Sequence, residues 1–428
     1  MLRAKVFSAY KNNSFKTGTL FSLFSVLNNG LNFLLIFGLS IYLSKADFGR
    51  INLFLIYVMV VSNIISLGTE SFFAVNYFNF HKIRLRKILS AIIYITSSIS
   101  ILLLLLSYFI GSDYILKYTL GRNILYATIC ICFFQFFQTM LLEIFRLEEK
   151  VWRYGMITLA WVTLNLILTF VILFNTDLSY KSRIYAHLIS ASIMFLLSVS
   201  ILCRKRYLSL SLPSVSLIKK CLNYGLPLLP HNSTTWLRSG MDRYFISFFF
   251  NASLLGVYSF AYNLSGVLLM IGTAFNAINS VYIYKTLSNK DDGTGDIEQQ
   301  IKFMIKFYFL IALFGYIASI VTIYVFIPKY LDSISLLAPF FIAALFQCYY
   351  YLFVNFILYY KQTRKLMYIT FSISVVHAIL SFFLTRYSIF YTAYLHLISN
   401  VVICILIYLL SLRYIPNFKG IFFKKLSI

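Results

Sequence analysis

The side chains most able to bind charged or polar ligands lie inside long apolar runs of the sequence. One run, PHNSTTWLRSGMDRYF over 230–245, contains Thr235, Arg238, Ser239, Asp242 and Arg243. The first four follow i, i+3, i+4, i+7 spacing, which places them on one face of an α-helix. A charged group inside a bilayer is costly and usually faces a water-filled cavity, so this stripe is a candidate binding surface.

A second polar stripe lies in the first apolar run, where Asn28 and Asn32 are one helical turn apart. An offset of 207 residues maps Asn28 onto Thr235 and Asn32 onto Ser239, and it also aligns the glycines that follow the two runs. We interpret the two runs as repeat-related helices. Their polar stripes are expected to line a central cavity together.

Several of these groups have a plainer interpretation. Arg238 and Asp242 are four residues apart and could simply neutralise each other. Arg243 either lines the cavity or extends to the outer interface, as long basic side chains often do. Glu70, in the segment LGTESFF, is either a cavity carboxylate or a packing residue. Asp242 and Glu70 are therefore candidates for ion coupling or for charge balance.

The remaining polar groups of the apolar runs are expected to be structural. Three amides are expected to form hydrogen bonds between helices: Gln135, Gln138 and Gln347. Three histidines stand alone in the sequence and are expected to be structural: His187, His377 and His396. The six cysteines have no partners at ligand spacing, and no nucleotide-binding or catalytic motif is present. We therefore expect no metal site, no cofactor and no catalytic residue.

The elements that carry these groups are predicted to be membrane-spanning helices. The chain is 60% hydrophobic and 12% charged, against about 45–50% and about 25% in soluble domains. A spanning helix needs about 20 mostly apolar residues. Twelve runs meet this length, near 18–43, 51–75, 88–110, 123–143, 154–174, 184–203, 222–248, 254–284, 303–327, 333–359, 366–385 and 390–412. Pro227 and Pro230 are expected to kink the seventh run near its start.

Basic residues alternate across the twelve runs. The two termini and every second connection hold 27 of the 37 Lys and Arg residues, whereas the opposite connections hold eight. By the positive-inside rule, both termini are predicted to lie in the cytoplasm. Most of the formal net charge of +24 thus reflects topology and needs no nucleic-acid partner.

The predicted fold is an all-α polytopic membrane protein with about 12 transmembrane helices in two six-helix lobes. The lobes are predicted to span 1–212 and 213–428 around a central cavity. Because six is an even number, both lobes have the same orientation. They would form a parallel repeat, as in many transporters.

Four segments carry a family resemblance: YGLPLLP before the seventh run, the pair Asp242–Arg243, LGVYSFAYNLS over 255–265, and GTES over 68–71. With the twelve spans, they resemble polysaccharide flippases of the Wzx type. These belong to the superfamily of multidrug, oligosaccharidyl-lipid and polysaccharide exporters.

The resemblance implies a transporter and not an enzyme. The expected activity is alternating-access translocation of undecaprenyl-pyrophosphate-linked oligosaccharide repeat units, for O-antigen or capsule. These would pass from the cytoplasmic to the periplasmic leaflet of the bacterial inner membrane. Partners would be this lipid-linked oligosaccharide, the bilayer and other membrane proteins of polysaccharide assembly.

Within this hypothesis, Arg238 and Arg243 hold the pyrophosphate, since guanidinium groups pair with phosphate oxygens. The Asn, Ser and Thr stripe would bond sugar hydroxyls. Asp242 or Glu70 would bind a coupling H⁺ or Na⁺, or balance Arg238.

Three alternatives remain open. A drug/ion antiporter of the same superfamily would favour acidic cavity residues. A membrane glycan polymerase would need a sizeable outward loop. A lipid II flippase typically has more than twelve spans.

Overall fold

The structure is a computed structural model that describes residues 2–109, 120–208, 212–288 and 294–413. The side chains of 2–19, 231, 285, 288 and 294–296 are outside this description. Residues 289–293 of the polar loop and the basic C-terminal stretch, 414–428, also lie outside the described residues. Within the described ranges every regular element is a helix, which confirms the predicted all-α fold.

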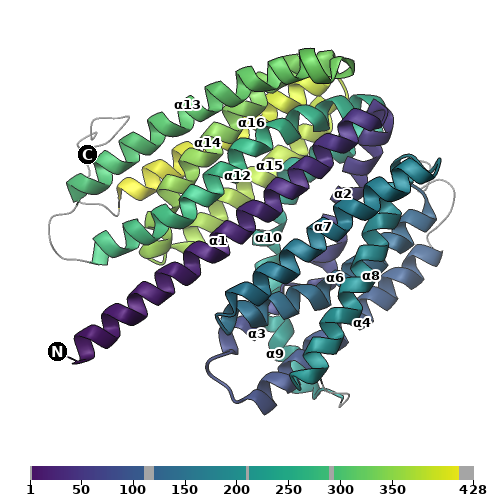
Figure 1. Ribbon diagram of the computed structural model, residues 1–428. Helices are drawn as coiled ribbons and strands as arrows, with labels where there is room; N and C mark the ends of the chain where they lie inside the picture. The colour runs from purple at the N-terminus through teal and green to yellow at the C-terminus, as the bar shows by residue number, and fades with distance from the viewer. Residues whose placement is uncertain (1, 110–119, 209–211, 289–293, 414–428) are drawn as a thin grey trace. The chain divides into compact units, whose positions relative to one another are not determined.

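The principal helices follow one another along the chain (Figure 1). They are α1 (Leu2–Tyr42), α2 (Lys45–Ser66), α3 (Glu70–Asn76), α4 (Lys82–Phe109), α6 (Arg122–Leu147), α7 (Val151–Asn175), α8 (Tyr180–Arg204), α9 (Val215–Gly225), α10 (Leu229–Thr235), α11 (Met241–Phe249), α12 (Ala252–Ser288), α13 (Thr294–Phe326), α14 (Ile334–Tyr359), α15 (Thr363–Thr385) and α16 (Ile389–Leu412). Among the described residues, 11 helices are long and apolar enough to cross a membrane. The chain is a multi-pass membrane protein, and each of these helices coincides with a predicted run.

The seventh predicted run, over 222–248, is helical but broken into short pieces. A 3₁₀ turn, Leu226–Leu228, separates α9 from α10, with Pro227 and Pro230 at or next to the breaks. This confirms the predicted kink, because proline cannot donate the helical hydrogen bond. A π-helical segment, Trp236–Gly240, then precedes α11. Such a segment adds a residue to the turn, so ideal α-helical spacing does not hold through the polar stripe.

The second predicted run is also interrupted. Leu67 and Gly68 have φ values of 47° and 67°, and these left-handed residues separate α2 from α3. The turn packs closely against the end of α9, where a Cβ added to Gly225 would lie 2.4 Å from the carbonyl oxygen of Leu67. Only glycine permits this approach of two backbones. The turn places Glu70 at the first position of α3.

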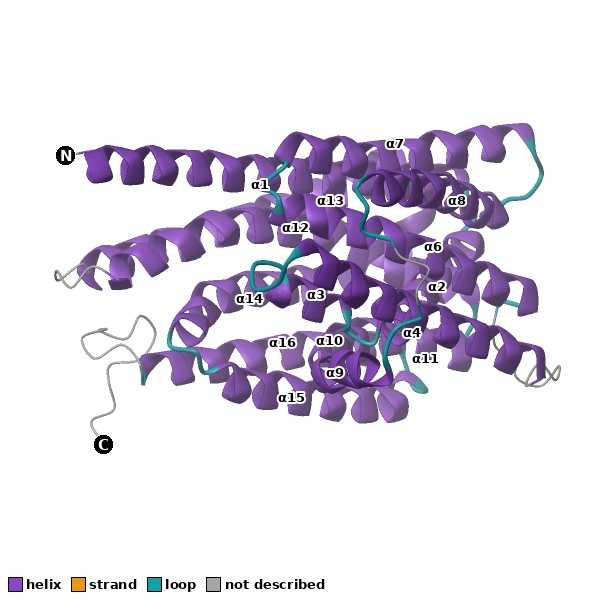
Figure 2. Ribbon diagram, turned by 90° about the horizontal axis from the view of Figure 1, so that it is seen from below, coloured by secondary structure: helices purple, strands orange, loops and turns teal. Residues whose placement is uncertain are grey.

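The described residues divide into two compact units. Unit 1 comprises the chain up to Leu35 and Ala46–Trp236, and unit 2 comprises Ile36–Lys45 and the chain from Leu237. The division into lobes 1–212 and 213–428 stays a prediction. In unit 2, α14 and α16 pack together and α15 lies beside α16 (Figure 2). Their core contains the fully buried rings of Tyr258, Phe340 and Phe353.

A short N-terminal segment, Ile36–Lys45, is part of unit 2 although 191 residues separate it from the rest of that unit. The ammonium of Lys329 donates to the carbonyl oxygens of Ile41 and Leu43 at 2.7 and 2.6 Å. Lys45 forms an ion pair with Asp332 at 2.5 Å. These contacts fix the end of α1 onto unit 2.

Candidate functional site

The carboxylate of Asp242 is the centre of a buried polar cluster in unit 2. Its side chain has no exposed surface. Oδ1 lies 2.9 Å from Nε2 of His377 and accepts a hydrogen bond of 2.5 Å from the hydroxyl of Ser381. Oδ2 accepts a bond of 3.1 Å from the hydroxyl of Tyr258. Groups from α12 and α15 thus converge on one carboxylate of α11.

The bonds of His377 define its tautomer. An ionised carboxylate can only accept hydrogen bonds, so Nε2 of His377 donates to Asp242. The other ring nitrogen, Nδ1, lies 2.8 Å from the hydroxyl of Ser399 in α16. In the neutral ring Nδ1 accepts from that hydroxyl. His377 therefore links α11, α15 and α16 through a satisfied, buried imidazole.

His396 completes the cluster without a hydrogen bond of its own to the carboxylate. Its Nδ1 lies 3.6 Å from Oδ2 of Asp242, which is too long for a hydrogen bond. This nitrogen is buried and has no hydrogen-bond partner among the described residues. The potential ligand atoms of Asp242, His377 and His396 all lie within 4.8 Å of one another. Two imidazoles and a carboxylate can share a proton or bind a divalent metal ion.

Arg238 lies in the π-helical segment and is half-buried. Its Nη1 donates to the side-chain oxygen of Asn400 in α16 at 2.9 Å, and its Nε has no hydrogen-bond partner in the part of the chain that the structure describes. The structure shows no ion pair between the described side chains of Arg238 and Asp242. Charge balance between the two groups without direct contact, one of the sequence alternatives, stays a prediction.

Arg243 is buried inside unit 2, with 7% of its surface exposed. Its guanidinium lies 4.3 Å from the ring centroid of Tyr262. Nε and Nη2 are buried without hydrogen-bond partners among the described residues. Its burial against an aromatic face favours the alternative that Arg243 faces the protein interior over extension to the outer interface.

The remaining predicted site residues, from both stripes and from α3, differ in their surroundings. Asn32 donates to the backbone oxygen of Asn28 in its own helix at 3.0 Å, and Oδ1 of Asn28 is buried without a hydrogen-bond partner. Thr235 is exposed and Ser239 is buried. Oε2 of Glu70 is buried and has no hydrogen-bond partner within the described ranges. Because these residues are divided between the two units, a shared cavity stays a prediction.

Some of the expected structural roles can be assigned. The amide of Gln135 in α6 lies 2.9 Å from Nε2 of His187 in α8, which confirms the predicted interhelical bond. His377 and His396, in contrast, do not act as isolated residues. The sequence held a signal for their pairing, because each lies about two helical turns from the short connection between α15 and α16. Neighbouring antiparallel helices place such residues at the same depth.

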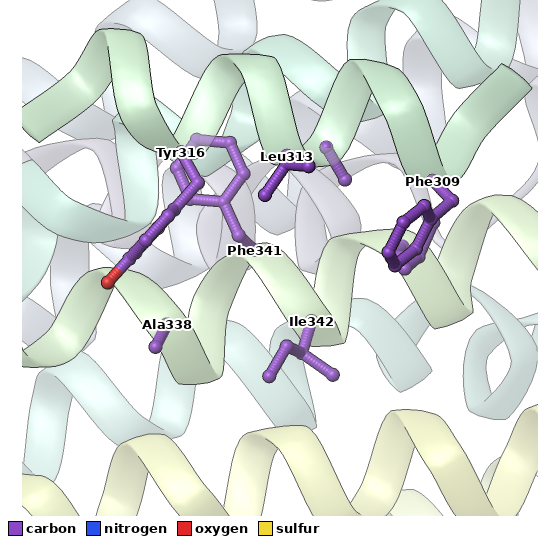
Figure 3. A pocket seen from close by; sticks show the side chains of 8 residues that line it. Phe309, Leu313, Tyr316, Ala338, Phe341 and Ile342 are labelled. Carbon is purple, nitrogen blue, oxygen red and sulfur yellow. The ribbon is translucent and has the colours of Figure 1, made fainter.

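Unit 2 also has an apolar pocket of about 230 Å³ between α13 and α14. Its wall includes Phe309, Leu313, Tyr316, Phe341 and Ile342 (Figure 3). It offers almost no polar surface, so it does not suit a sugar or an ion.

Comparison with known proteins places these features in a family. Residues 15–283, more than half of the chain, match the family described as polysaccharide biosynthesis protein. A relative of Haemophilus influenzae, "Lsg locus putative protein 1", is 23% identical over 410 residues, which cover 93% of this chain and 98% of that protein.

Solved structures show the same fold. The lipid II flippase MurJ, in an inward closed conformation, is 16% identical with a TM-score of 0.74, covering 92% of this chain and 87% of that chain. An inward-facing multidrug resistance MATE transporter of the MOP superfamily is 15% identical with a TM-score of 0.66, covering 90% and 93%.

These relatives are transporters and a flippase, in agreement with the expectation that this chain is not an enzyme. The chain belongs to the polysaccharide biosynthesis protein family and has the flippase-like transporter fold of the MOP superfamily.

Proposed function

We propose that this protein is a flippase for undecaprenyl-pyrophosphate-linked oligosaccharide repeat units, destined for O-antigen or capsule. The observation that carries the proposal is a pair of arginines in unit 2. Arg238 and Arg243 keep buried donors without hydrogen-bond partners among the described residues. A buried donor that lacks a partner costs free energy, so binding of a ligand that accepts a hydrogen bond from it is favoured. Membership of the polysaccharide biosynthesis family supports this substrate class.

Each group of the predicted site has a role in the proposal. Arg238, with Arg243, binds the pyrophosphate, whose negative charge is expensive to place in hydrocarbon. The polar side chains of the two stripes bond sugar hydroxyls: Asn28, Asn32, Thr235 and Ser239. The lipid tail remains in the bilayer while the protein alternates between inward-open and outward-open states.

The cluster around Asp242 is proposed as the ion-coupling site. The 3.6 Å gap between His396 and the carboxylate leaves an imidazole nitrogen free to take up a proton. A ring nitrogen can exchange a proton but binds Na⁺ poorly, which favours H⁺ over Na⁺ as the coupling ion. Glu70 is a second carboxylate for coupling or charge balance. The proposed location is the inner membrane with both termini in the cytoplasm, in contact with other polysaccharide-assembly proteins.

The test is a deletion strain assayed for the lipid-linked repeat unit in each leaflet. The proposal expects the unit to accumulate in the cytoplasmic leaflet and expects rescue by the wild-type gene. Arg238→Ala and Arg238→Lys should both fail to rescue at normal protein abundance, because lysine lacks the bidentate geometry. Arg386→Ala, which removes an exposed arginine of unit 2, is the matched control.

Two results would contradict the proposal. Normal flipping with lost polymerisation would indicate a glycan polymerase. Full rescue by both Arg238 variants would remove the phosphate-binding role.

An ion-coupled drug antiporter is the second candidate, favoured by the buried acid Asp242 and the MATE-like fold. It predicts that the deletion changes drug susceptibility and leaves lipid-linked intermediates unchanged.

A further inference from the structure

Asn400 in α16 contacts the arginine to which the substrate pyrophosphate is assigned. Its side-chain oxygen accepts from Nη1 of Arg238 at 2.9 Å, and its side-chain nitrogen donates to the backbone oxygen of His396 at 2.8 Å. A guanidinium can only donate and a carbonyl can only accept, so both contacts require the same orientation of the amide. Asn400 is buried, with 5% of its surface exposed. The amide is therefore fixed at both ends and cannot turn without the loss of a hydrogen bond.

The helix α16 contacts the broken seventh run at two levels. Asn400 bonds Arg238, and one turn earlier in α16 the ring of His396 lies 3.6 Å from the carboxylate of Asp242. Arg238 and Asp242 are also four residues apart, but their order along the chain is reversed with respect to their partners. The two contacts thus fix the register of α16 along the π-helical segment and α11. The position of the Arg238 side chain depends on α16 as well as on its own turn.

The partner of Arg238 is a neutral group. Within the described ranges, its guanidinium forms no ion pair and no hydrogen bond besides the one to Asn400. A guanidinium has five N–H donors, and the buried one at Nε is without a hydrogen-bond partner among the described residues. A carboxylate in the place of the Asn400 amide would form an ion pair and cancel the charge of the arginine. The amide holds the guanidinium and leaves its charge available to an anion.

We propose that Asn400 is a positioning residue for Arg238. It holds the guanidinium in one orientation, so the remaining N–H donors are ordered before the phosphate oxygens of the substrate arrive. Such order raises affinity, because a side chain that is already fixed loses little freedom when the ligand binds. The inference rests on the proposed function, in which Arg238 binds the pyrophosphate. A purely structural bond between α16 and the seventh run predicts a different result for binding.

The test measures binding of farnesyl diphosphate to the purified full-length protein in detergent, with farnesol as the uncharged comparison. Asn400→Ala frees the guanidinium and should weaken binding of farnesyl diphosphate about three- to tenfold, the cost of ordering one long side chain. Asn400→Asp neutralises it and should weaken this binding at least about tenfold, the strength of a hydrogen bond to a charged group. The affinity for farnesol should not change. A purely structural bond predicts the reverse order of the two variants, since aspartate keeps an acceptor for Arg238 and alanine does not.

A double-mutant cycle shows whether Asn400 acts through the arginine. Arg238→Gln alone should weaken binding of farnesyl diphosphate at least about tenfold, and the addition of Asn400→Ala should cause no further loss. Asn355→Ala is the matched control and should leave the affinity unchanged. Asn355 is a buried asparagine of α14 whose side chain likewise donates to the backbone oxygen four residues earlier, that of Tyr351, at 2.9 Å.

Three results would overturn the inference. Unchanged affinity in both Asn400 variants, together with a loss in Arg238→Gln, would leave Arg238 as the phosphate-binding residue and remove only the role of Asn400. An equal loss from Asn400→Ala in the Arg238→Gln background, or an equal loss for farnesol, would show that Asn400 acts elsewhere. Unchanged affinity in Arg238→Gln would overturn the proposed function and this inference together.

Discussion

Replacement of Asp242 separates the structural role of this carboxylate from its proposed coupling role. The side chain is fully buried and receives hydrogen bonds from His377, Ser381 and Tyr258. In Asp242→Ala these donors lose their acceptor inside the protein. Each buried donor that is left without an acceptor costs about 1–3 kcal/mol. We therefore expect Asp242→Ala to be strongly destabilised.

Asp242→Asn has the same shape and should be tolerated far better. Its amide oxygen can still accept from His377 and Ser381. Its amide nitrogen would face Tyr258 and His396, whose hydroxyl and free ring nitrogen can both accept. The stability that is lost is then the contribution of the negative charge to the hydrogen bonds from His377 and Ser381, about 1 kcal/mol for each bond. The reduced desolvation of a neutral group offsets part of it, so the net loss should stay below about 2 kcal/mol.

Thermal unfolding in detergent, followed by tryptophan fluorescence, measures the stability of the two variants. Rescue of the deletion strain measures their transport activity. Asp242→Asn should fold and yet fail to support transport. Asp177→Asn, at an exposed acid outside the spans, is the control and should be nearly neutral. Wild-type transport by Asp242→Asn would refute the coupling role. Wild-type stability of Asp242→Ala would refute the energetic reasoning.

Two further predictions concern stability. Gly256→Ala should destabilise the protein by at least about 1–3 kcal/mol, because the new Cβ would lie 1.9 Å from the carbonyl oxygen of Lys45; Gly266→Ala in the same helix, where the space is open, should be stabilising by up to about 1 kcal/mol. Both are read from the unfolding temperature, and equal shifts would contradict the packing argument. Outside the spans, burial tends to raise the pKa of Glu148, but hydrogen bonds from two lysines lower it below the usual value. Its folded-state pKa is thus below the unfolded one, so its stabilising contribution is present above about pH 4.3 and is lost as the pH falls through the folded value. The gap in unfolding temperature between the wild type and Glu148→Gln should therefore close on acidification; a gap that widens would show that the lysine contacts are unimportant.

Hydropathy was sufficient to predict most of the fold. Eleven of the twelve predicted runs are long helices, because an isolated apolar run of this length has few other stable states in a bilayer. The break in the seventh run was foreseeable at Pro227 and Pro230, which interrupt the helix by their covalent structure. The π-helical segment over 236–240 has no comparable local signal. It depends on packing that a single sequence does not display.

The candidate site was predicted less completely. Arg238 and Asp242 were identified from their own chemistry, since charged groups are conspicuous in apolar runs. Their actual partners, Asn400, His377 and His396, lie 135 or more residues away. Such pairings follow from tertiary contact and cannot be read from local spacing. The burial of Arg243 against Tyr262 was missed for the same reason.

The attachment of residues 36–45 to unit 2 has a consequence for biosynthesis. Lys329, which holds the end of α1, is made 284 residues after Lys45. At a synthesis rate of about 5–20 residues per second, this first segment waits roughly 15–60 s in the membrane for its partner. During that time the end of α1 must contact the insertion machinery or lipid, because the part of unit 2 that it binds has not yet been synthesised. A chain divided near its midpoint would have to recover this contact between two separate polypeptides.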